Sequence, residues 1–124
     1  MSKIIYTKNA PEAIGPYSQA ITTGNLVFTS GQIPINPETG NVEATTIEAQ
    51  TEQVCKNLCA VLEAAGTSIE KVVKTTCYLQ SMEDFASFNE IYAKYFTGKP
   101  ARSCVAVKTL PKNVLVEIDT IAEI

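Results

Sequence analysis

Hydrophobic and polar positions in the first third of the chain predict a β-hairpin followed by a long loop. Apolar stretches at residues 19–23 and Leu26–Thr29 flank Gly24 and Asn25, a pair suited to a two-residue turn because both residues tolerate positive φ. Beyond the hairpin, glycine and proline recur in two turn-forming clusters. We therefore expect two strands joined by a tight turn, and then loop over residues 30–44.

The middle of the chain predicts a long helix and then a strand. Thr45, followed three residues later by Glu48, forms a capping-box pattern, and Gly66 is a stop signal. Residues Val72–Leu79 are rich in β-branched and aromatic side chains and too few for a second helix of this kind, so we expect a strand there. The expected helix lies between Thr45 and Gly66, where apolar residues recur at helical spacing at Val54, Leu58, Val61, Leu62 and Ala65.

A second helix and two further strands complete the pattern. Aromatic residues follow one helical face from Ser81 until Gly98 ends the run, and we expect them to belong to the core. Residues 102–107 and 114–122 alternate as strands around a turn at 110–113. Because strands occur before, between and after two helices, we expect an α+β sandwich with the helices on one sheet face. The aromatic residues on the second helix are Phe85, Phe88, Tyr92, Tyr95 and Phe96.

Length and composition fit one domain. The 124 residues are 45% hydrophobic and 19% charged, enough for one core but not two, so we expect a single domain over residues 1–124. The first residues lack the apolar run of a secretory signal, and no segment approaches the roughly 20 apolar residues of a membrane span. We therefore expect a cytoplasmic protein without a membrane partner. Cys55 and Cys59 fall in a helical pattern and Cys77 and Cys104 in strand-like runs, which makes a disulfide framework unexpected.

Charge and missing residue types narrow the possible chemistry. The net charge is −3 and the basic residues are scattered, so nucleic acid is not the expected partner. The chain has no histidine, which removes the commonest general base and every histidine-dependent nucleophile. It also has no CxxC pair, so we expect no metal. Neither GxGxxG nor GxxxxGK[ST] occurs, which favours chemistry without a cofactor.

Two charged residues in the last two expected strands are the main candidates for chemistry. Glu117 projects from a strand face on which Leu115 and Ile121 are apolar. A carboxylate is unusual on such a face unless it has a specific role. Arg102 closely follows Pro100, whose rigidity can fix the direction of a guanidinium suited to bidentate capture of a carboxylate. A cross-strand or intersubunit salt bridge explains both residues at least as well from spacing alone.

Other polar residues are weaker candidates. Cys104 shares a strand face with Arg102, but lone cysteines are usually packing residues, and no neighbouring histidine would make this one a thiolate. Tyr17, Ser18 and Ser30 sit beside glycine or proline in expected loops. Ligand-binding groups collect in such loops, but turn chemistry places the same residues there.

Motifs in a fixed order make the chain resemble the RidA/YjgF family. The resemblance spans essentially the whole chain, and its four main motifs lie at separations that chance does not explain. They are AIGPYSQA at residues 13–20, TSGQIP at 29–34, PARSCV at 100–105 and VEI at 116–118, with KTT at 74–76 and FNEIY at 88–92 between them.

This resemblance implies a fold, an assembly and an activity. The fold is a chorismate-mutase-like α+β sandwich, a mixed sheet with two helices packed on one face. The assembly is a barrel-like homotrimer with a ligand site in each cleft between subunits. The activity is that of a 2-iminobutanoate/2-iminopropanoate deaminase, which acts on reactive enamine or imine products of pyridoxal-phosphate enzymes such as threonine dehydratase. The protein itself would need no cofactor.

Matching the motifs residue by residue implies roles for individual side chains. Arg102 would clamp the substrate carboxylate, and Glu117 would hold the hydrolytic water and take its proton. Asn89 and Tyr17 have equally good structural interpretations, the first as a helix-face hydrogen-bonding residue and the second as a packed interface ring. Gly31 would act through its backbone N–H. The full lining implied is Tyr17, Ser30, Gly31, Asn89 and the main chain at Cys104.

One position departs from the resemblance, and one alternative function stays open. Lys99 precedes Pro100 where many relatives carry an apolar or aromatic residue, and a charge there bears on which imino acids enter. Members of this family group have also been linked with translation inhibition, RNA cleavage and chaperone-like behaviour. The alternative to a deaminase is therefore a non-catalytic regulatory module that binds small acids.

Overall fold

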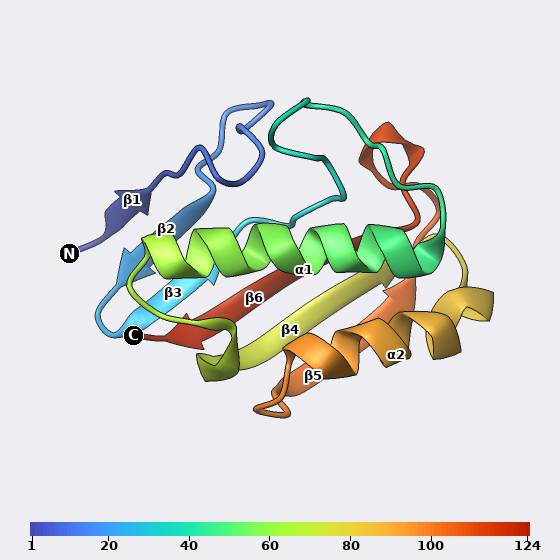
Figure 1. Ribbon diagram of the computed structural model, residues 1–124. Helices are drawn as coiled ribbons and strands as arrows, with labels where there is room; N and C mark the ends of the chain where they lie inside the picture. The colour runs from blue at the N-terminus through green and yellow to red at the C-terminus, as the bar shows by residue number, and fades with distance from the viewer.

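Six strands form one mixed sheet, and two α-helices cover one of its faces, in a computed structural model that describes all residues 1–124 (Figure 1). The strand order is β1-β2-β3-β6-β4-β5, and every neighbouring pair is antiparallel except β4 and β5. This architecture confirms the expected α+β class. The elements are β1 Lys3–Ile5, β2 Ala20–Thr23, β3 Leu26–Thr29, α1 Ile47–Ala64, β4 Val72–Leu79, α2 Phe85–Tyr95, β5 Ala101–Ala106 and β6 Val116–Glu123.

The N-terminal hairpin is confirmed, and the structure adds a strand beside it. Thr23 pairs with Leu26 across the turn, but of the two turn residues only Gly24 takes a positive φ, of 57°. The loop expected over residues 30–44 contains no helix or strand of its own. β1 pairs with β2 at the sheet edge. The sequence pattern does not reveal β1, because three residues are too few to show an alternation.

Helix α1 begins one residue later than the capping-box pattern predicts. Thr46, rather than Thr45, caps the helix, and its Oγ1 accepts a hydrogen bond from the Ala49 N–H at 3.1 Å. This shift makes Ala49 the third helical residue in place of Glu48, so no carboxylate returns a bond to the cap. The second helix also starts late, because Ser81 caps a short 3₁₀ turn that precedes α2.

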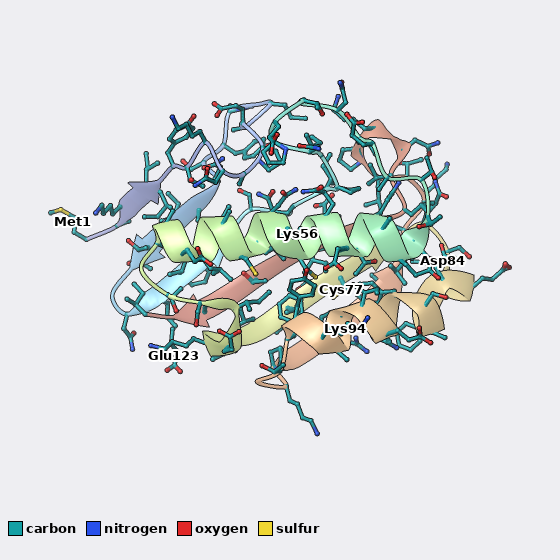
Figure 2. The ribbon with its side chains drawn as sticks, in the orientation of Figure 1. Met1, Lys56, Cys77, Asp84, Lys94 and Glu123 are labelled. Atoms are coloured by element: carbon teal, nitrogen blue, oxygen red, sulfur yellow. The ribbon has the colours of Figure 1, made fainter.

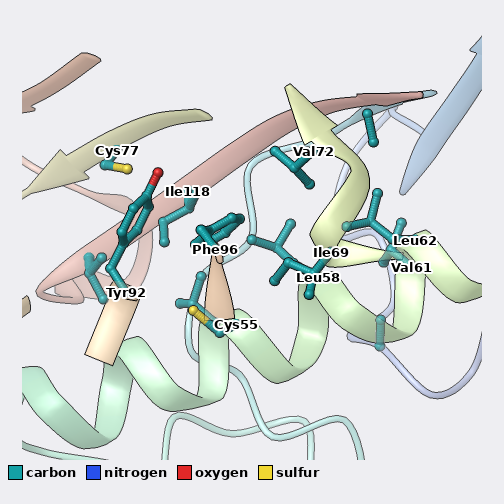
Figure 3. Packing of buried hydrophobic residues seen from close by; sticks show 14 of the residues in the cluster. Cys55, Leu58, Val61, Leu62, Ile69, Val72, Cys77, Tyr92, Phe96 and Ile118 are labelled. Atoms are coloured by element: carbon teal, nitrogen blue, oxygen red, sulfur yellow. The ribbon is translucent and has the colours of Figure 1, made fainter. Parts of the chain in front are cut away.

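One apolar core fills the space between the helices and the sheet (Figure 3). It contains Leu58 and Leu62 of α1, Phe88 of α2, Leu79 of β4 and Ile118 of β6, all fully buried. Burying side chains of this size stabilises the fold by about 1.5–3 kcal/mol each. The core therefore fixes both helices on the same sheet face.

Three of the five aromatic residues expected in the core are buried. Phe88 and Tyr92 have ring centroids 5.5 Å apart, and Tyr92 stacks on Phe96 at 4.4 Å. Phe85 and Tyr95 are only half-buried at the margin of α2. The helical spacing of the aromatics thus identifies the core-facing side of α2 but not how deep each ring lies.

The two faces of the sheet differ sharply in what covers them. Along β6, Val116 and Ile118 are buried against the helices, whereas Glu117 and Asp119 point to the other side and remain half-exposed. No helix covers that second face (Figure 1).

Figure 2 shows Cys77 of β4 on the helix side, and all four cysteines are free thiols. Neither α-helix has the length and apolar character that crossing a bilayer requires.

Candidate functional site

The guanidinium of Arg102 is held beneath α2 by one amide and two aromatic rings. Its Nη1 donates to Asn89 Oδ1 at 2.7 Å, and its central carbon lies 4.8 Å from the Tyr92 ring centroid and 5.4 Å from that of Phe85. These three α2 residues are spaced by four and by three, so they share one helix face. Cation–π attraction and the hydrogen bond fix the direction of the guanidinium and leave its other N–H groups without a protein partner.

The strand that carries Arg102 is itself anchored to the core. Arg102 pairs in register with Thr75 of β4, and Thr75 Oγ1 lies 2.8 Å from the hydroxyl oxygen of Tyr92. β4 supports β5 on one side, but the other side of β5 is an unpaired sheet edge. The arginine is therefore rigidly mounted at an open edge of the sheet.

Cys104 lies two residues further along β5, on the same face as Arg102. Burial raises the pKa of the Cys104 thiol, and the charge of Arg102 only partly opposes that effect. The thiol thus stays protonated, which argues against Cys104 as a nucleophile. Val107 N–H donates to Leu79 O at 2.9 Å, so by strand alternation the amide of Cys104 points away from β4 to the open edge. Its main chain is available to a ligand or a partner.

Glu117 lies in a hollow of about 370 Å³ on the opposite side of the sheet. The hollow brings Glu117 together with Tyr17, Ser30 and Gly31, four of the residues singled out from the sequence. Tyr17 is about half exposed, and its hydroxyl accepts a hydrogen bond from the Ile14 N–H at 3.3 Å. Its ring is therefore a wall of the hollow rather than part of the core. The remaining lining residues are Ile14, Ile33 and Pro111.

Hydrogen bonds hold the loop after β3 against the strand that carries Glu117. Gln32 N–H donates to Ile118 O at 2.8 Å, and Ile118 N–H donates back to Gln32 O at 3.2 Å. Ser30 Oγ donates to the carbonyl of Ser18, which ties this loop to the one that carries Tyr17. The hollow is thus built by backbone geometry on both sides of Glu117.

Gly31 leaves the space that the Glu117 carboxylate occupies. A Cβ at Gly31 would lie 2.9 Å from Glu117 Cδ and would overlap its Oε2. The Gly31 N–H makes no hydrogen bond within the chain, and the Cα side of this residue faces the carboxylate. Only glycine permits so close an approach at this position.

The environment of Glu117 favours its protonated form more than water does. Burial raises the pKa of Glu117, and the nearby carboxylate of Asp119 raises it further. The pKa of Asp119 is also raised by burial, against the lowering effects of Tyr78, Thr76 and Lys74. A carboxyl group whose pKa is moved toward neutrality is suited to accept and return a proton.

The candidate residues fall into two groups on opposite faces of the sheet. β4 neighbours both groups, since its Thr75 pairs with Arg102 and its Tyr78 pairs with Glu117. Thr75 and Tyr78 are three residues apart on one strand, so their side chains point to opposite faces. Hence Arg102, with Asn89 and Cys104, faces the helices, and Glu117, with its hollow, faces the uncovered side. A single chain does not bring Arg102 and Glu117 together.

Comparison with known proteins identifies the family. The family model described as Endoribonuclease L-PSP matches residues 7–124. A 2-iminobutanoate/2-iminopropanoate deaminase of Escherichia coli K12 is 50% identical over 126 residues, covering 98% of both chains. The chain belongs to the RidA/YjgF (endoribonuclease L-PSP) family. The resemblance seen in the sequence motifs is thereby confirmed.

Two further relatives place this RidA/YjgF protein among similar chains of nearly the same length. A RutC family protein of Pyrococcus horikoshii is 55% identical over 123 residues, which is 98% of each chain. The crystal structure of E. coli TdcF with bound serine is 43% identical and superimposes with a TM-score of 0.94, covering 98% of each chain. These similarities cover the whole domain and not only the site motifs.

Several residues of the two groups escape sequence reasoning. From the sequence, Phe85 and Tyr92 are expected to be core aromatics. Their helical spacing on either side of Asn89 is the one feature that indicates that they and Asn89 can contact the same side chain. Asp119 shares its strand face with Glu117, as the two-residue period shows. Pro111 reads only as a turn residue, and nothing in the sequence places that turn beside Glu117.

Proposed function

We propose that this RidA/YjgF protein hydrolyses 2-imino acids, such as 2-iminobutanoate and 2-iminopropanoate, to 2-oxo acids and ammonia. The observation that carries the proposal is the pair of complementary half-sites, a fixed guanidinium at one sheet face and a carboxylate of raised pKa at the other. The name of the 50%-identical E. coli relative supports the same chemistry.

The Arg102 half-site suits the carboxylate of a 2-imino acid. The guanidinium is immobilised by Asn89, Phe85 and Tyr92, so little conformational entropy is lost when it binds a ligand. Its unpaired N–H groups can form a bidentate bond with a carboxylate. Because the imine carbon is bonded to the carboxylate carbon, fixing the one orients the other. The serine bound by TdcF, like a 2-imino acid, has a carboxylate bonded to the carbon that carries nitrogen.

The Glu117 half-site suits the water that attacks the imine. Glu117 would accept a proton as the water oxygen bonds to the carbon of the protonated imine, giving a neutral tetrahedral amino alcohol. Return of that proton to nitrogen restores the Glu117 carboxylate and lets the C–N bond break, and the departing ammonia takes the hydroxyl proton as the carbonyl forms and leaves as ammonium. A raised pKa serves both steps, because the same group must accept and then donate the proton.

We propose that assembly completes the site, with Arg102 of one chain facing Glu117 of the partner subunit in a homotrimer. The opposite-face arrangement supports this, since neither half-site can act alone. The exposed apolar residues of the uncovered face and of the free edge also support it: Phe28 is 40% exposed and Val105 47%. Apolar exposure of this kind favours contact between copies.

The test generates 2-iminobutanoate with threonine dehydratase and follows 2-oxobutanoate formation while semicarbazide competes for the imine. Wild type should speed release of the oxo acid and lower semicarbazone formation. Arg102→Ala should match the protein-free blank, because no substrate is held. Glu117→Gln should lower turnover by about 10²–10⁴-fold, the usual contribution of a general base. Glu123→Gln removes an exposed carboxylate from the same strand and should leave turnover unchanged.

Binding separates catalysis from the alternative of a regulatory acid-binding module. A deaminase should keep affinity for 2-oxobutanoate in Glu117→Gln while losing turnover. A binding module should show no wild-type turnover above the blank, and its affinity should depend on Arg102 alone. That second result would reject the enzymatic proposal.

A further inference from the structure

We propose that Lys99 makes this site select 2-imino acids that carry a second carboxylate, with 2-iminoglutarate as the model substrate. The inference rests on the proposed deaminase function and adds the class of substrate. It comes from Lys99 and the hollow that Lys99 and Arg102 line together, to which the proposed hydrolysis assigns no role.

Arg102 lines a hollow of about 520 Å³, and the residues around this hollow include two cations and no carboxylate. The second cation is Lys99, and Tyr92, Phe96 and Pro100 supply apolar walls. Concave surfaces with charges of one sign and walls of low dielectric concentrate the electric field. The hollow therefore attracts anions more strongly than one arginine would. The remaining lining residues are Ala93 and Thr97.

The backbone of Lys99 is fixed in the turn between α2 and β5. Its N–H donates to Phe96 O at 3.3 Å, and its φ is 53°, in the left-handed region. The preceding Gly98 packs closely against the segment Ile69–Lys71, because a Cβ there would lie 2.7 Å from Glu70 O. The turn is thus braced, while the exposed lysine side chain keeps the freedom to reach a bound ligand.

The two cations differ in a way that suits two different carboxylates. Arg102 is immobile and presents a planar fork, which fits the carboxylate that must be oriented for reaction. Lys99 is a compact charge on a flexible stem, which fits a distal carboxylate at the end of a short chain. The reaction itself is unchanged: water adds to the imine carbon, ammonia leaves, and both carboxylates remain intact.

The experiment compares two five-carbon imino acids that differ in the terminal carboxylate. Amino-acid oxidases with catalase generate 2-iminoglutarate from glutamate and 2-iminopentanoate from norvaline, and semicarbazide competes for each imine. Wild type should prefer 2-iminoglutarate in kcat/KM. In Lys99→Gly this preference should fall about threefold to tenfold, as expected for losing one unit charge near a protein surface. The preference should also weaken with added salt.

Lys112→Gly is the matched control. Lys112 is also an exposed lysine with positive φ, at 55°, but it lines a separate hollow of about 130 Å³. Glycine tolerates both backbone conformations, so both variants should fold. An unchanged preference in Lys99→Gly, or an equal loss in Lys112→Gly, would overturn the assignment.

Equilibrium binding distinguishes failure of this inference from failure of the deaminase proposal. Calorimetry with 2-oxoglutarate and 2-oxopentanoate measures the same selectivity without turnover. If neither imine is hydrolysed faster than in the blank, the deaminase proposal fails, and a Lys99-dependent preference for 2-oxoglutarate still supports the selective hollow. If wild type binds neither oxo acid, or binds both equally well, the selectivity inference fails.

Discussion

The helix-covered face and the uncovered face of the sheet differ in how they position a charged side chain. On the covered face, buried residues such as Ile118 pack against two helices, and that packing also immobilises Arg102. On the uncovered face, Glu117 is positioned by a hydrogen-bonded loop and stays half-exposed beside Asp119. One face provides rigidity and the other provides a tunable carboxyl group. Because the two groups lie on opposite faces, the proposed site needs two chains to unite them.

Two isoleucines of β6 test the contrast in stability. Ile118 is fully buried and Ile121 is half-exposed on the other face. Ile118→Ala should lower the free energy of unfolding by about 2–5 kcal/mol at any protein concentration. Ile121→Ala should cost less than about 1 kcal/mol in the monomer, with a further loss only where assembly covers this face. Urea unfolding over a range of protein concentrations measures both, and equal, concentration-independent losses would contradict the contrast.

Gly31→Ala perturbs the uncovered face without touching the core. The new Cβ would displace the Glu117 carboxylate, and misplacement of a catalytic group by about 1 Å can lower turnover by about 10²-fold. Gly15→Ala is the control, because its Cβ would meet only the Tyr17 ring at 3.5 Å, an ordinary contact. Turnover should fall in the first variant and stay near wild type in the second. Normal turnover in Gly31→Ala would show that the position of Glu117 is not critical.

Asn89→Ala perturbs the support of Arg102 on the covered face. Loss of one charge-assisted hydrogen bond is worth about 1.5–3 kcal/mol at most, and the two aromatic rings still restrain the guanidinium. We expect KM to rise about tenfold with little change in kcat, since Asn89 positions the arginine and the base is untouched. A fall in kcat at constant KM would instead assign Asn89 to the chemical step.

Glu117→Gln should make the protein slightly more stable at neutral pH. The pKa of Glu117 is raised on folding, so its ionisation in the folded state costs stability as pH rises through that pKa. Glutamine removes this cost, and the gain should stay below about 1 kcal/mol because the group is half-exposed. Thermal unfolding against pH should show the gain at neutral pH and its loss in acid. A variant that is less stable at neutral pH would contradict the assigned environment.

Asp119→Asn should shift the pH dependence of turnover in a defined direction. The Asp119 charge raises the pKa of Glu117, so removing it should move the acid limb of the pH–rate profile to lower pH. An unmoved acid limb would mean that Glu117 does not set the profile. This is the smallest change expected among the variants.

Segments with a strong hydrophobic period could be predicted from the sequence. A short strand, and the choice between two adjacent threonines as a helix cap, could not. The repeat of Leu58 and Leu62 marks α1 because a buried helix face must recur every three to four residues. Lys3–Ile5 cannot show an alternation, and Thr45 and Thr46 are chemically equivalent as caps. Tertiary packing decides between such alternatives.

The separation of Arg102 from Glu117 could not be predicted from the sequence. Alternation assigns faces within one strand, but relating the faces of two strands requires their register. Here both β5 and β6 are related through β4, whose pairing is parallel on one side and antiparallel on the other. A shift of one residue in either pairing would reverse the relation. The residue types indicate the chemistry, whereas the strand pairing decides which face of the sheet carries each group.

Mixing two inactive variants tests the composite site most directly. Arg102→Ala and Glu117→Gln are unfolded together in equal amounts, refolded and assayed with 2-iminobutanoate, beside each variant treated alone. If each site joins Arg102 of one chain to Glu117 of the partner subunit, about one quarter of the sites in randomly mixed trimers regain both groups. The mixture should therefore show about a quarter of wild-type activity. Activity no higher than that of the separate variants would contradict the composite site.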